Sequence, residues 1–420
     1  MPGPVTRIVK IVSAALTLSA CDPGVFRASQ AWPVDTDASV PVQTPAAAGD
    51  SGQSGPEKAG ASAGLAGVGG AVGTAGAGAA GAAGAVAGCP QADDVTAVRI
   101  SSSELGALTT PNPAGWLAGG LAERVQDRVL WLFYESDVGP PVAAWSNAQD
   151  ILHMPPQLGD APLIKPIFSN VGDADNTFIP TSAWLHDARE VRFFYSNFPG
   201  IYPLSLGVAS ISVGAPGATI LKAPGEVFAA DSAADGGVAS DWLPVAFAGA
   251  FQQDGFVYAY ACQARPDAAD EQQGAAHQQP CRAARVQTAR VLEGDQYTFW
   301  NGQAWVGDFD RAVVVLDHMP SGLSVAYNTY LGKYLATHSG VDNDVVLQWA
   351  DSPAGPFERL GSISTLKATA GFGLTYSALE HVTLRESCDR VLYVSYVLPL
   401  RDSDDPGVRK ETHLLRVELE

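Results

Sequence analysis

Several carboxylic acids in this sequence stand close to aromatic residues, a combination suited to chemistry on sugars. Asp241 directly precedes Trp242, and Glu380 follows Tyr376 by four positions. Cleaving a glycosidic bond needs two carboxyl groups, one to protonate the leaving oxygen and one to activate water or attack the sugar. Flat aromatic rings offer a large contact surface on which a sugar can stack. Asp241 and Glu380 are therefore our candidates for such a carboxylate pair.

Further residues complete this predicted site. Asp175 or Glu135 is expected to serve as a third, modulating acid, and Trp300 as a stacking platform beside Trp242 and Tyr376. His381 is expected to act as a hydrogen-bond partner near Glu380. The alternative for each acid is an exposed loop position, because the chain contains 44 acidic residues. The alternative for the tryptophans is packing between structural elements.

Metal and cofactor signals are weak. Three oxygen-rich segments could hold calcium, but none has the twelve-residue loop with a central Gly and a closing Glu, so we expect solvated turns. These segments are 173–176, 342–344 and 402–405. Outside the Gly/Ala-rich segment 59–88, the sequence has no G-x-S-x-G elbow, phosphate-binding glycine loop or H-E-x-x-H motif. We therefore predict no metal site and no cofactor.

A repeated unit must position the acids. An apolar strand, a tight polar turn and an aromatic-rich strand recur five times, and Asp-Gly, Asp-Arg or other Gly-containing turns suit hairpins. The second strands of the five copies start near residues 129, 191, 256, 334 and 391. This spacing predicts an all-β, five-bladed β-propeller, with a pair of β-sandwiches or another blade count as the alternative. The first strands would surround the axis, with the acids where those strands begin.

The first strands are expected at 120–122, 180–184, 245–251, 323–327 and 381–384. We expect 95–100 to close the ring by lying beside 413–419.

The cysteines indicate an oxidising compartment. Apart from Cys21, the chain has Cys89, Cys262, Cys281 and Cys388, an even number that points to disulfides in an exported protein. Of the three possible pairings we favour Cys262–Cys281 with Cys89–Cys388. The second bridge would tie the start of the domain to its last repeat.

The N-terminus predicts export. Arg7 and Lys10 precede an apolar run, 11–20, that suits a signal peptide and is too short to span a bilayer as a stop-transfer helix. The run ends in Leu-Ser-Ala-Cys, which resembles the lipobox of bacterial lipoproteins, in which the cysteine is lipidated. We therefore predict a signal peptide at 1–20 and a lipid anchor on Cys21 that holds the protein at the inner or outer membrane of the cell envelope. A plain secretory peptide is the alternative.

Composition separates a linker from the folded part. Between positions 59 and 88, 24 of 30 residues are Gly or Ala, so segment 21–88 is expected to be a flexible linker rather than an Ala-driven helix. Residues 89–420 then form the propeller domain. The formal net charge is −19, and the first 88 residues contribute only −1 of it (four basic against five acidic residues). An acidic domain repels nucleic acid, so we expect a neutral glycan as partner and a monomer.

Three segments carry a family resemblance. They are Tyr-Thr-Phe-Trp-Asn-Gly-Gln-Ala-Trp at 297–305, the stretch from Tyr327 to Tyr334 followed by Ala-Asp-Ser-Pro-Ala-Gly-Pro-Phe at 350–357, and Ile-Pro-Thr-Ser-Ala at 179–183. Together they resemble the bacterial domain of unknown function 4185, over roughly 110–419. That family belongs with the five-bladed propeller glycoside hydrolases, and some members look like endo-acting arabinanases.

The resemblance implies a surface glycoside hydrolase that acts on a neutral, arabinan-like polysaccharide. The family's first-blade aspartate has no counterpart in 111–116, where the sequence reads Pro-Asn-Pro-Ala-Gly-Trp, and Glu135 or Asp137 stands in for its second aspartate. The alternative is a catalytically inactive propeller that binds glycan or protein. A structural role in envelope assembly is a third hypothesis.

Overall fold

The computed structural model describes most of the region after residue 87. The described residues are 88–109, 117–136, 141–153, 157–158, 161–162, 165–167, 177–198, 203, 205–212, 218–229, 244, 246–262, 279–319, 321–367, 374–401 and 408–420. The predicted signal peptide, the lipidation site Cys21 and all of the predicted linker except Gly88 lie outside these residues.

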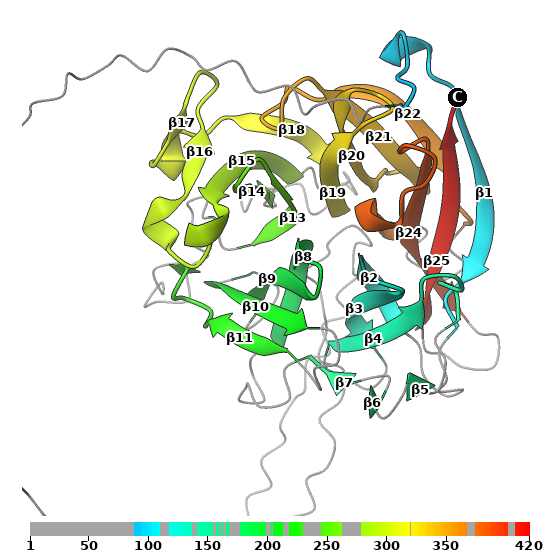
Figure 1. Ribbon diagram of the computed structural model, residues 1–420, viewed down its shortest axis with the longest axis horizontal. Coiled ribbons are helices and arrows are strands. Elements are labelled where there is room, and N and C mark those ends of the chain that lie inside the picture. Colours follow the sequence, from blue (N-terminus) through cyan, green and yellow to red (C-terminus); the bar gives the residue numbers. More distant parts are fainter. Residues whose placement is uncertain are drawn as a thin grey trace, which may run out of the picture. The chain divides into compact units, whose positions relative to one another are not determined.

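The described residues form five antiparallel sheets of four or more strands around a ring (Figure 1). Each sheet starts at the centre with an inner strand, and each inner strand contacts the next, so that the ring is closed. The inner strands are β2 (Leu117–Val125), β8 (Thr177–Asp187), β13 (Phe247–Gln253), β19 (Ser321–Asn328) and β23 (Tyr376–Glu380). The prediction of an all-β, five-bladed propeller is therefore confirmed.

The second strand of each blade pairs with its inner strand as a hairpin. These strands are β3 (Arg128–Ser136), β9 (Glu190–Phe198), β14 (Phe256–Cys262), β20 (Lys333–Ser339) and β24 (Val391–Arg401). The turn at Asp254 and Gly255 has φ of 51° and 79° at these residues, the left-handed conformations that a two-residue hairpin turn requires. The Asp-Gly pair therefore reverses the chain as predicted.

Outer strands complete the blades. They are β4 (Val142–Asn147), β7 (Lys165–Pro166), β10 (Ser205–Ser212), β11 (Thr219–Lys222), β12 (Phe228–Ala229), β15 (Gln279–Gln287), β16 (Thr298–Trp300), β17 (Trp305–Val306), β18 (Val314–Met319), β21 (Asp344–Ala350), β22 (Glu358–Ser364), β25 (Val408–Leu419) and β1 (Ile100–Ala107). A separate pair is formed by β5 (Gln157–Leu158) and β6 (Ala161–Pro162).

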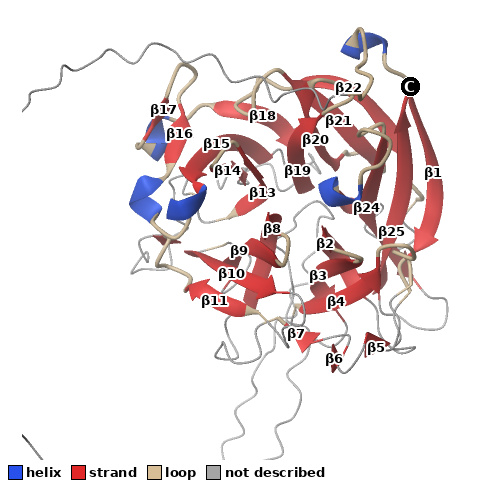
Figure 2. Ribbon diagram, viewed as in Figure 1, coloured by secondary structure: helices blue, strands red, loops and turns tan. Residues whose placement is uncertain are grey.

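Helical structure in the described residues is limited to single 3-10 turns (Figure 2). They are η1 (Val95–Ala97), η2 (Thr288–Arg290), η3 (Gly294–Gln296), η4 (Phe309–Arg311) and η5 (Val382–Leu384). No helix in the described residues is long and apolar enough to cross a membrane.

The core lies between neighbouring blades. Phe194 of the second blade meets Phe247 of the third with ring centroids 4.9 Å apart, and Trp184 packs beside them. Seven of the eight residues of β10 are buried, because both faces of this strand are covered. The aromatic and β-branched residues by which the strands were recognised in the sequence are thus buried between the blades.

The two ends of the domain close the ring within one sheet. Strand β1 pairs with β25 from Ile100 opposite Leu419 to Ala107 opposite His413. The partner strand His413–Leu419 was predicted correctly, but the closing strand is 100–107 rather than 95–100. Residues Val95–Ala97 instead form the turn η1, in which the Asp94 side chain accepts a hydrogen bond from the Thr96 N–H. Because this cap stabilises a turn, residues 95–97 do not pair as part of the closing strand.

Both predicted disulfides are present, Cys89–Cys388 and Cys262–Cys281. The bridge Cys89–Cys388 ties the start of the domain to the last blade.

His413 lies where β1 and β25 close the ring. Its Nδ1 is 3.0 Å from Glu104 on β1, and its Nε2 is 3.1 Å from Glu411. Burial lowers the pKa of His413, but its hydrogen bonds to the Glu104 and Glu411 carboxylates outweigh this effect, so the pKa stands above its ordinary value.

The inner strand of the fifth blade corrects the sequence prediction. It was expected at 381–384, but it is β23, Tyr376–Glu380, and the predicted segment contains η5. The Leu384 N–H donates to the His381 carbonyl at 2.9 Å and the Arg385 N–H to the Val382 carbonyl at 3.3 Å, so backbone groups of this segment pair within their own turn. Glu380 is consequently the last residue of an inner strand, not a residue that precedes one.

Candidate functional site

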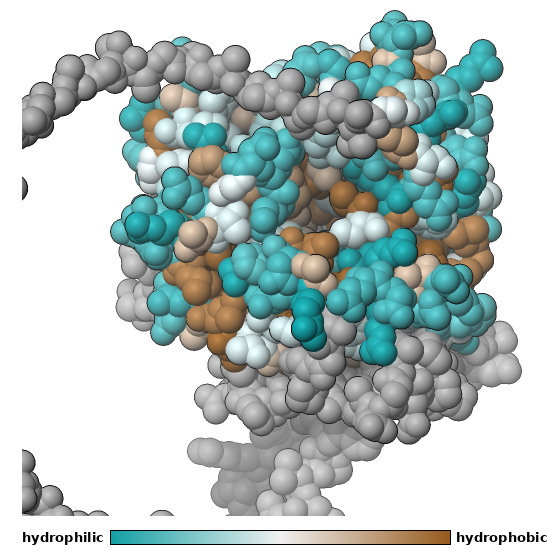
Figure 3. All heavy atoms as spheres, viewed as in Figure 1, coloured by the Kyte–Doolittle hydropathy of each residue, from teal (hydrophilic) through white to brown (hydrophobic). Residues whose placement is uncertain are grey.

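All five inner strands contribute to one cavity on the axis. Its lining consists of small or apolar residues and a few polar ones: Leu121, Ala122, Glu123, Ser182, Ala183, Gly249, Ala250, Leu323, Ser324, Val325, Leu379, Glu380, His381 and Val382. Figure 3 shows hydrophobic side chains gathered near the centre of the ring, within a mainly hydrophilic rim. The cavity measures about 40 Å³, which is room for about two or three water molecules. A sugar ring is larger and would have to bind at an end of this cavity.

Glu123 is a carboxylic acid of this cavity that sequence reasoning missed. It lies in the second half of β2, and its Oε2 is buried without a hydrogen-bond partner among the described residues. Burial raises the pKa of Glu123 to about 8, while a hydrogen bond with the Thr383 hydroxyl acts in the opposite direction. Glu123 therefore carries its proton at neutral pH. No sequence signal marked it, because only acids near strand starts were considered.

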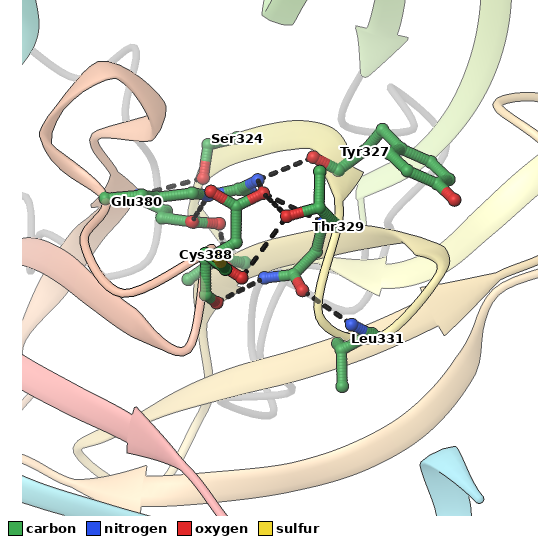
Figure 4. Close-up of polar contacts among 10 residues, drawn as sticks. Ser324, Tyr327, Thr329, Leu331, Glu380 and Cys388 are labelled. Atoms are coloured by element: carbon green, nitrogen blue, oxygen red, sulfur yellow. Dashed lines mark hydrogen bonds and ion pairs between the residues drawn. The ribbon is translucent and has the colours of Figure 1, made fainter. Parts of the chain in front are cut away.

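Glu380 also lines this cavity, and it is paired with a cation. Its Oε1 accepts a hydrogen bond from Arg385 Nε at 2.6 Å, and the two side chains are 0 % and 3 % exposed. Its Oε2 accepts from the Thr337 hydroxyl at 3.3 Å. Arg385 is thus the ion-pair partner of Glu380, which Figure 4 shows within a group of polar contacts.

The Arg385 side chain links two blades. It donates to the Tyr327 carbonyl at 2.5 Å and lies 3.4 Å from the Asp389 carboxylate. Asp389 also accepts from the Thr329 N–H and hydroxyl at 2.8 and 2.9 Å. These contacts join the β19–β20 hairpin to the turn before β24 (Figure 4). Glu380 is therefore part of a buried network that also holds the fold.

His381 lines the cavity but is held by its neighbours. Its Nε2 lies 2.9 Å from the Ser395 hydroxyl, and its ring meets Trp131 edge-on at 5.1 Å. Burial lowers the pKa of His381 to about 3, so the ring is neutral. This arrangement agrees with a hydrogen-bond partner rather than a general base.

The other predicted site residues do not gather at the cavity within the described residues. Asp175, Asp241 and Trp242 lie outside those residues, and Glu135 is placed only as a position of β3. Tyr376 starts β23, half-buried, with Lys410 over its ring at 5.9 Å. Trp300 lies on β16 at the outer edge of the third blade, away from the inner strands (Figure 1). The extra hairpin β16–β17 at the end of this sheet therefore keeps Trp300 away from the axial cavity.

Cation-binding groups do not cluster in the part of the chain that the structure describes. There, no three or more His, Cys, Asp or Glu residues gather as a metal site would require. In the predicted segment 342–344, Asp344 is paired with Arg359 at 3.8 Å. Segments 173–176 and 402–405 lie outside the described residues.

Comparison with known families supports the sequence motifs. Residues 217–408 match the family model described as Domain of unknown function (DUF4185). The resemblance is confirmed over this region. It contains the motifs at 297–305 and 350–357, while the motif at 179–183 lies before it. No protein with a curated description matches the sequence.

Several solved structures are similar to the chain. A thermostable family-43 glycoside hydrolase shares 14 % identity with a TM-score of 0.47, covering 74 % of this chain and 95 % of its own. The catalytic domain of Coprinopsis cinerea GH62 alpha-L-arabinofuranosidase shares 10 % with a TM-score of 0.47, covering 77 % and 98 %. The GH43_1 enzyme from Xanthomonas citri shares 14 % with a TM-score of 0.40, covering 74 % and 89 %. At these identities the likenesses say nothing about substrate.

Proposed function

We propose that the protein is an exported glycoside hydrolase that cleaves a neutral polysaccharide at an axial end of its propeller. The carrying observation is that the carboxyl groups of Glu123, whose pKa is raised, and of Glu380, which is ion-paired with Arg385, line one axial cavity. Glycoside hydrolysis needs one carboxyl protonated and the other ionised. The DUF4185 resemblance favours an arabinan-like polymer as substrate.

The residues divide the work as follows. Glu380, kept ionised by Arg385, and Asp241, which precedes β13 in the sequence, are the proposed carboxylate pair. Glu123 supplies a third, protonated acid, the role that the sequence suggested for Asp175 or Glu135. Because the described cavity admits only water-sized groups, the sugar binds beyond it, and water within the cavity connects Glu123 to the reacting end.

Hydrolysis is tested with the full chain on a panel of neutral polysaccharides, by the release of new reducing ends. We expect one polymer to be cleaved, and Asp241→Asn to lower the rate by about 10²- to 10⁴-fold, the scale of a lost acid–base catalyst. Glu380→Gln should also abolish release, and Glu123→Gln should remove an alkaline decline of the rate near pH 8. Glu293→Gln, an exposed acid beside Arg290, is the matched control.

Release of reducing ends that survives both Asp241→Asn and Glu380→Gln would discard the proposed pair. Melting temperatures are recorded for every variant, because Glu380→Gln also disturbs the buried network around Arg385.

The second candidate function is binding without turnover. The engagement of both Glu380 oxygens by Arg385 and Thr337 favours it. Saturable binding to a polymer with no release would select this function.

We further propose that a lipid on Cys21 anchors the protein to the cell envelope. The Leu-Ser-Ala-Cys sequence at the end of an apolar run supports this. Cys21→Ser should move the protein from the membrane fraction to the soluble fraction and abolish incorporation of a labelled fatty acid, measured in an export-competent bacterial host. A Cys21→Ser protein that stays in the membrane fraction would contradict the anchor, and a variant that replaces Ser19 is the control for altered cleavage alone.

A further inference from the structure

A row of six aromatic rings runs from the fourth blade to the outer hairpin of the third. Neighbouring ring centroids are 5.2 to 6.0 Å apart. In order, the rings are Tyr327, Tyr334, Phe251, Tyr258, Trp305 and Trp300. None of them lines the axial cavity. The row is therefore a feature separate from the candidate active site.

The row is not entirely core. Phe251 and Tyr334 are buried, 8 % and 7 % exposed, and join the row to the packing between the blades. The other four rings, those of Tyr327, Tyr258, Trp305 and Trp300, are partly exposed. Solvent therefore reaches most of the row, including its whole outer end.

The outer end is held rigidly. Trp300 and Trp305 are directly opposite each other across the β16–β17 hairpin, so their rings share one face of it. The hairpin turn is fixed by the Asn301 side chain, which accepts from the N–H groups of Gln303 and Ala304 at 3.0 and 2.8 Å. The Arg285 guanidinium lies 4.5 Å from the Trp305 ring centre. A ligand would therefore meet a platform that needs little ordering on binding.

The platform also has polar groups to offer. Neither the Trp300 nor the Trp305 indole N–H donates a hydrogen bond within the described part of the protein, and neither is buried. Tyrosine and tryptophan combine a flat apolar body with a polar tip. Sugar rings present the matching surface, with apolar C–H faces and hydroxyl groups at the edge. A net charge of −19 disfavours a polyanion.

We propose that this aromatic row binds a stretch of neutral polysaccharide chain, at a site separate from the axial cavity. The choice of a neutral glycan rests on the proposed function, but binding at the row needs no bond cleavage. The four partly exposed rings, Trp300 and Trp305 at the outer end among them, would contact sugars of this chain. A site of this kind holds the polymer on the surface of the third and fourth blades.

The test is retardation of the full chain during native electrophoresis through gels that contain single neutral polysaccharides. We expect one polymer to retard the unmodified protein. Trp300→Ala and Trp305→Ala should each weaken the association about 5- to 10-fold, the scale of a lost aromatic contact. Trp349→Ala is the matched control, because Trp349 is partly exposed on the fourth blade, beneath Lys333, and outside the row.

Trp305→Phe keeps a flat ring, so it should retain most of the retardation and also the fold. Equal retardation of the unmodified protein, Trp300→Ala and Trp305→Ala would overturn the proposal, as would an equal loss in Trp349→Ala. Retardation by no neutral polymer would overturn it too. Retardation that depends on the aromatic row, without any release of reducing ends, would support this binding site and contradict the proposed hydrolase function.

Discussion

Arg385→Met is expected to lower the free energy of unfolding by about 3–5 kcal/mol, because it leaves the Glu380 carboxylate buried without its cation. Both side chains are almost fully buried, and their nitrogen and oxygen lie 2.6 Å apart. Asp389 loses the same partner, which loosens the link between the fourth and fifth blades. Urea unfolding of the full chain, followed by far-UV circular dichroism, measures the change.

A matched pair on the surface provides the control. Arg290 and Glu293 are also 2.6 Å apart but are 50 % and 44 % exposed, so Arg290→Met should change stability by less than about 1 kcal/mol. The double variant Arg385→Met with Glu380→Gln removes both charges and should be more stable than Arg385→Met alone. A loss in Arg385→Met no larger than in Arg290→Met would show that the buried pair does not hold the blades together.

Glu123→Gln is expected to stabilise the protein at alkaline pH and to change its stability little near pH 4.5. The Glu123 pKa is about 8 in the folded protein, against an ordinary value of 4.5. Between these values the unfolded chain releases the proton that the folded protein retains, so stability falls as pH rises through this window. At about 1.4 kcal/mol for each unit of pKa difference, the loss reaches up to about 5 kcal/mol at pH 8.

The measurement is the free energy of unfolding at pH 5.5 and pH 8.5 for the unmodified protein and Glu123→Gln. The stability of Glu123→Gln should decline less between the two pH values. His413, whose raised pKa also makes stability fall as pH rises, contributes equally to both proteins and cancels in the comparison. Glu293→Gln should keep the decline of the unmodified protein. Parallel pH dependences for the unmodified protein and Glu123→Gln would mean that Glu123 is ionised and solvated in the folded state.

The two buried carboxyls connect stability with function. The raised pKa of Glu123 lowers stability at alkaline pH, and under the proposed function the same residue supplies an acid at the axis, beside the Glu380–Arg385 ion pair. A protein that needed only a packed channel would be more stable with apolar residues in both places. This contrast is why variants of Glu123 and Glu380 are informative in both kinds of experiment.

The sequence by itself determined the fold class, the number of blades and the cysteine pairing. These features follow from local rules: a hairpin such as β13–β14 needs only alternating side chains and a turn like Asp254-Gly255. Recurrence of that unit five times leaves a ring of five blades. The even number of cysteines in a chain predicted to be exported, with two of them flanking one polar insertion, indicated the bridge Cys262–Cys281.

Only the tertiary structure decided which side chains reach the axis. Three consecutive residues of β2, 121–123, line the cavity, whereas the next residue, Arg124, is exposed. Ring closure placed Glu380 at the end of β23 and gave it Arg385 as partner. The β16–β17 hairpin carried Trp300 to the outer edge of its blade. These placements depend on packing between blades that are distant in sequence, and no local pattern encodes that packing.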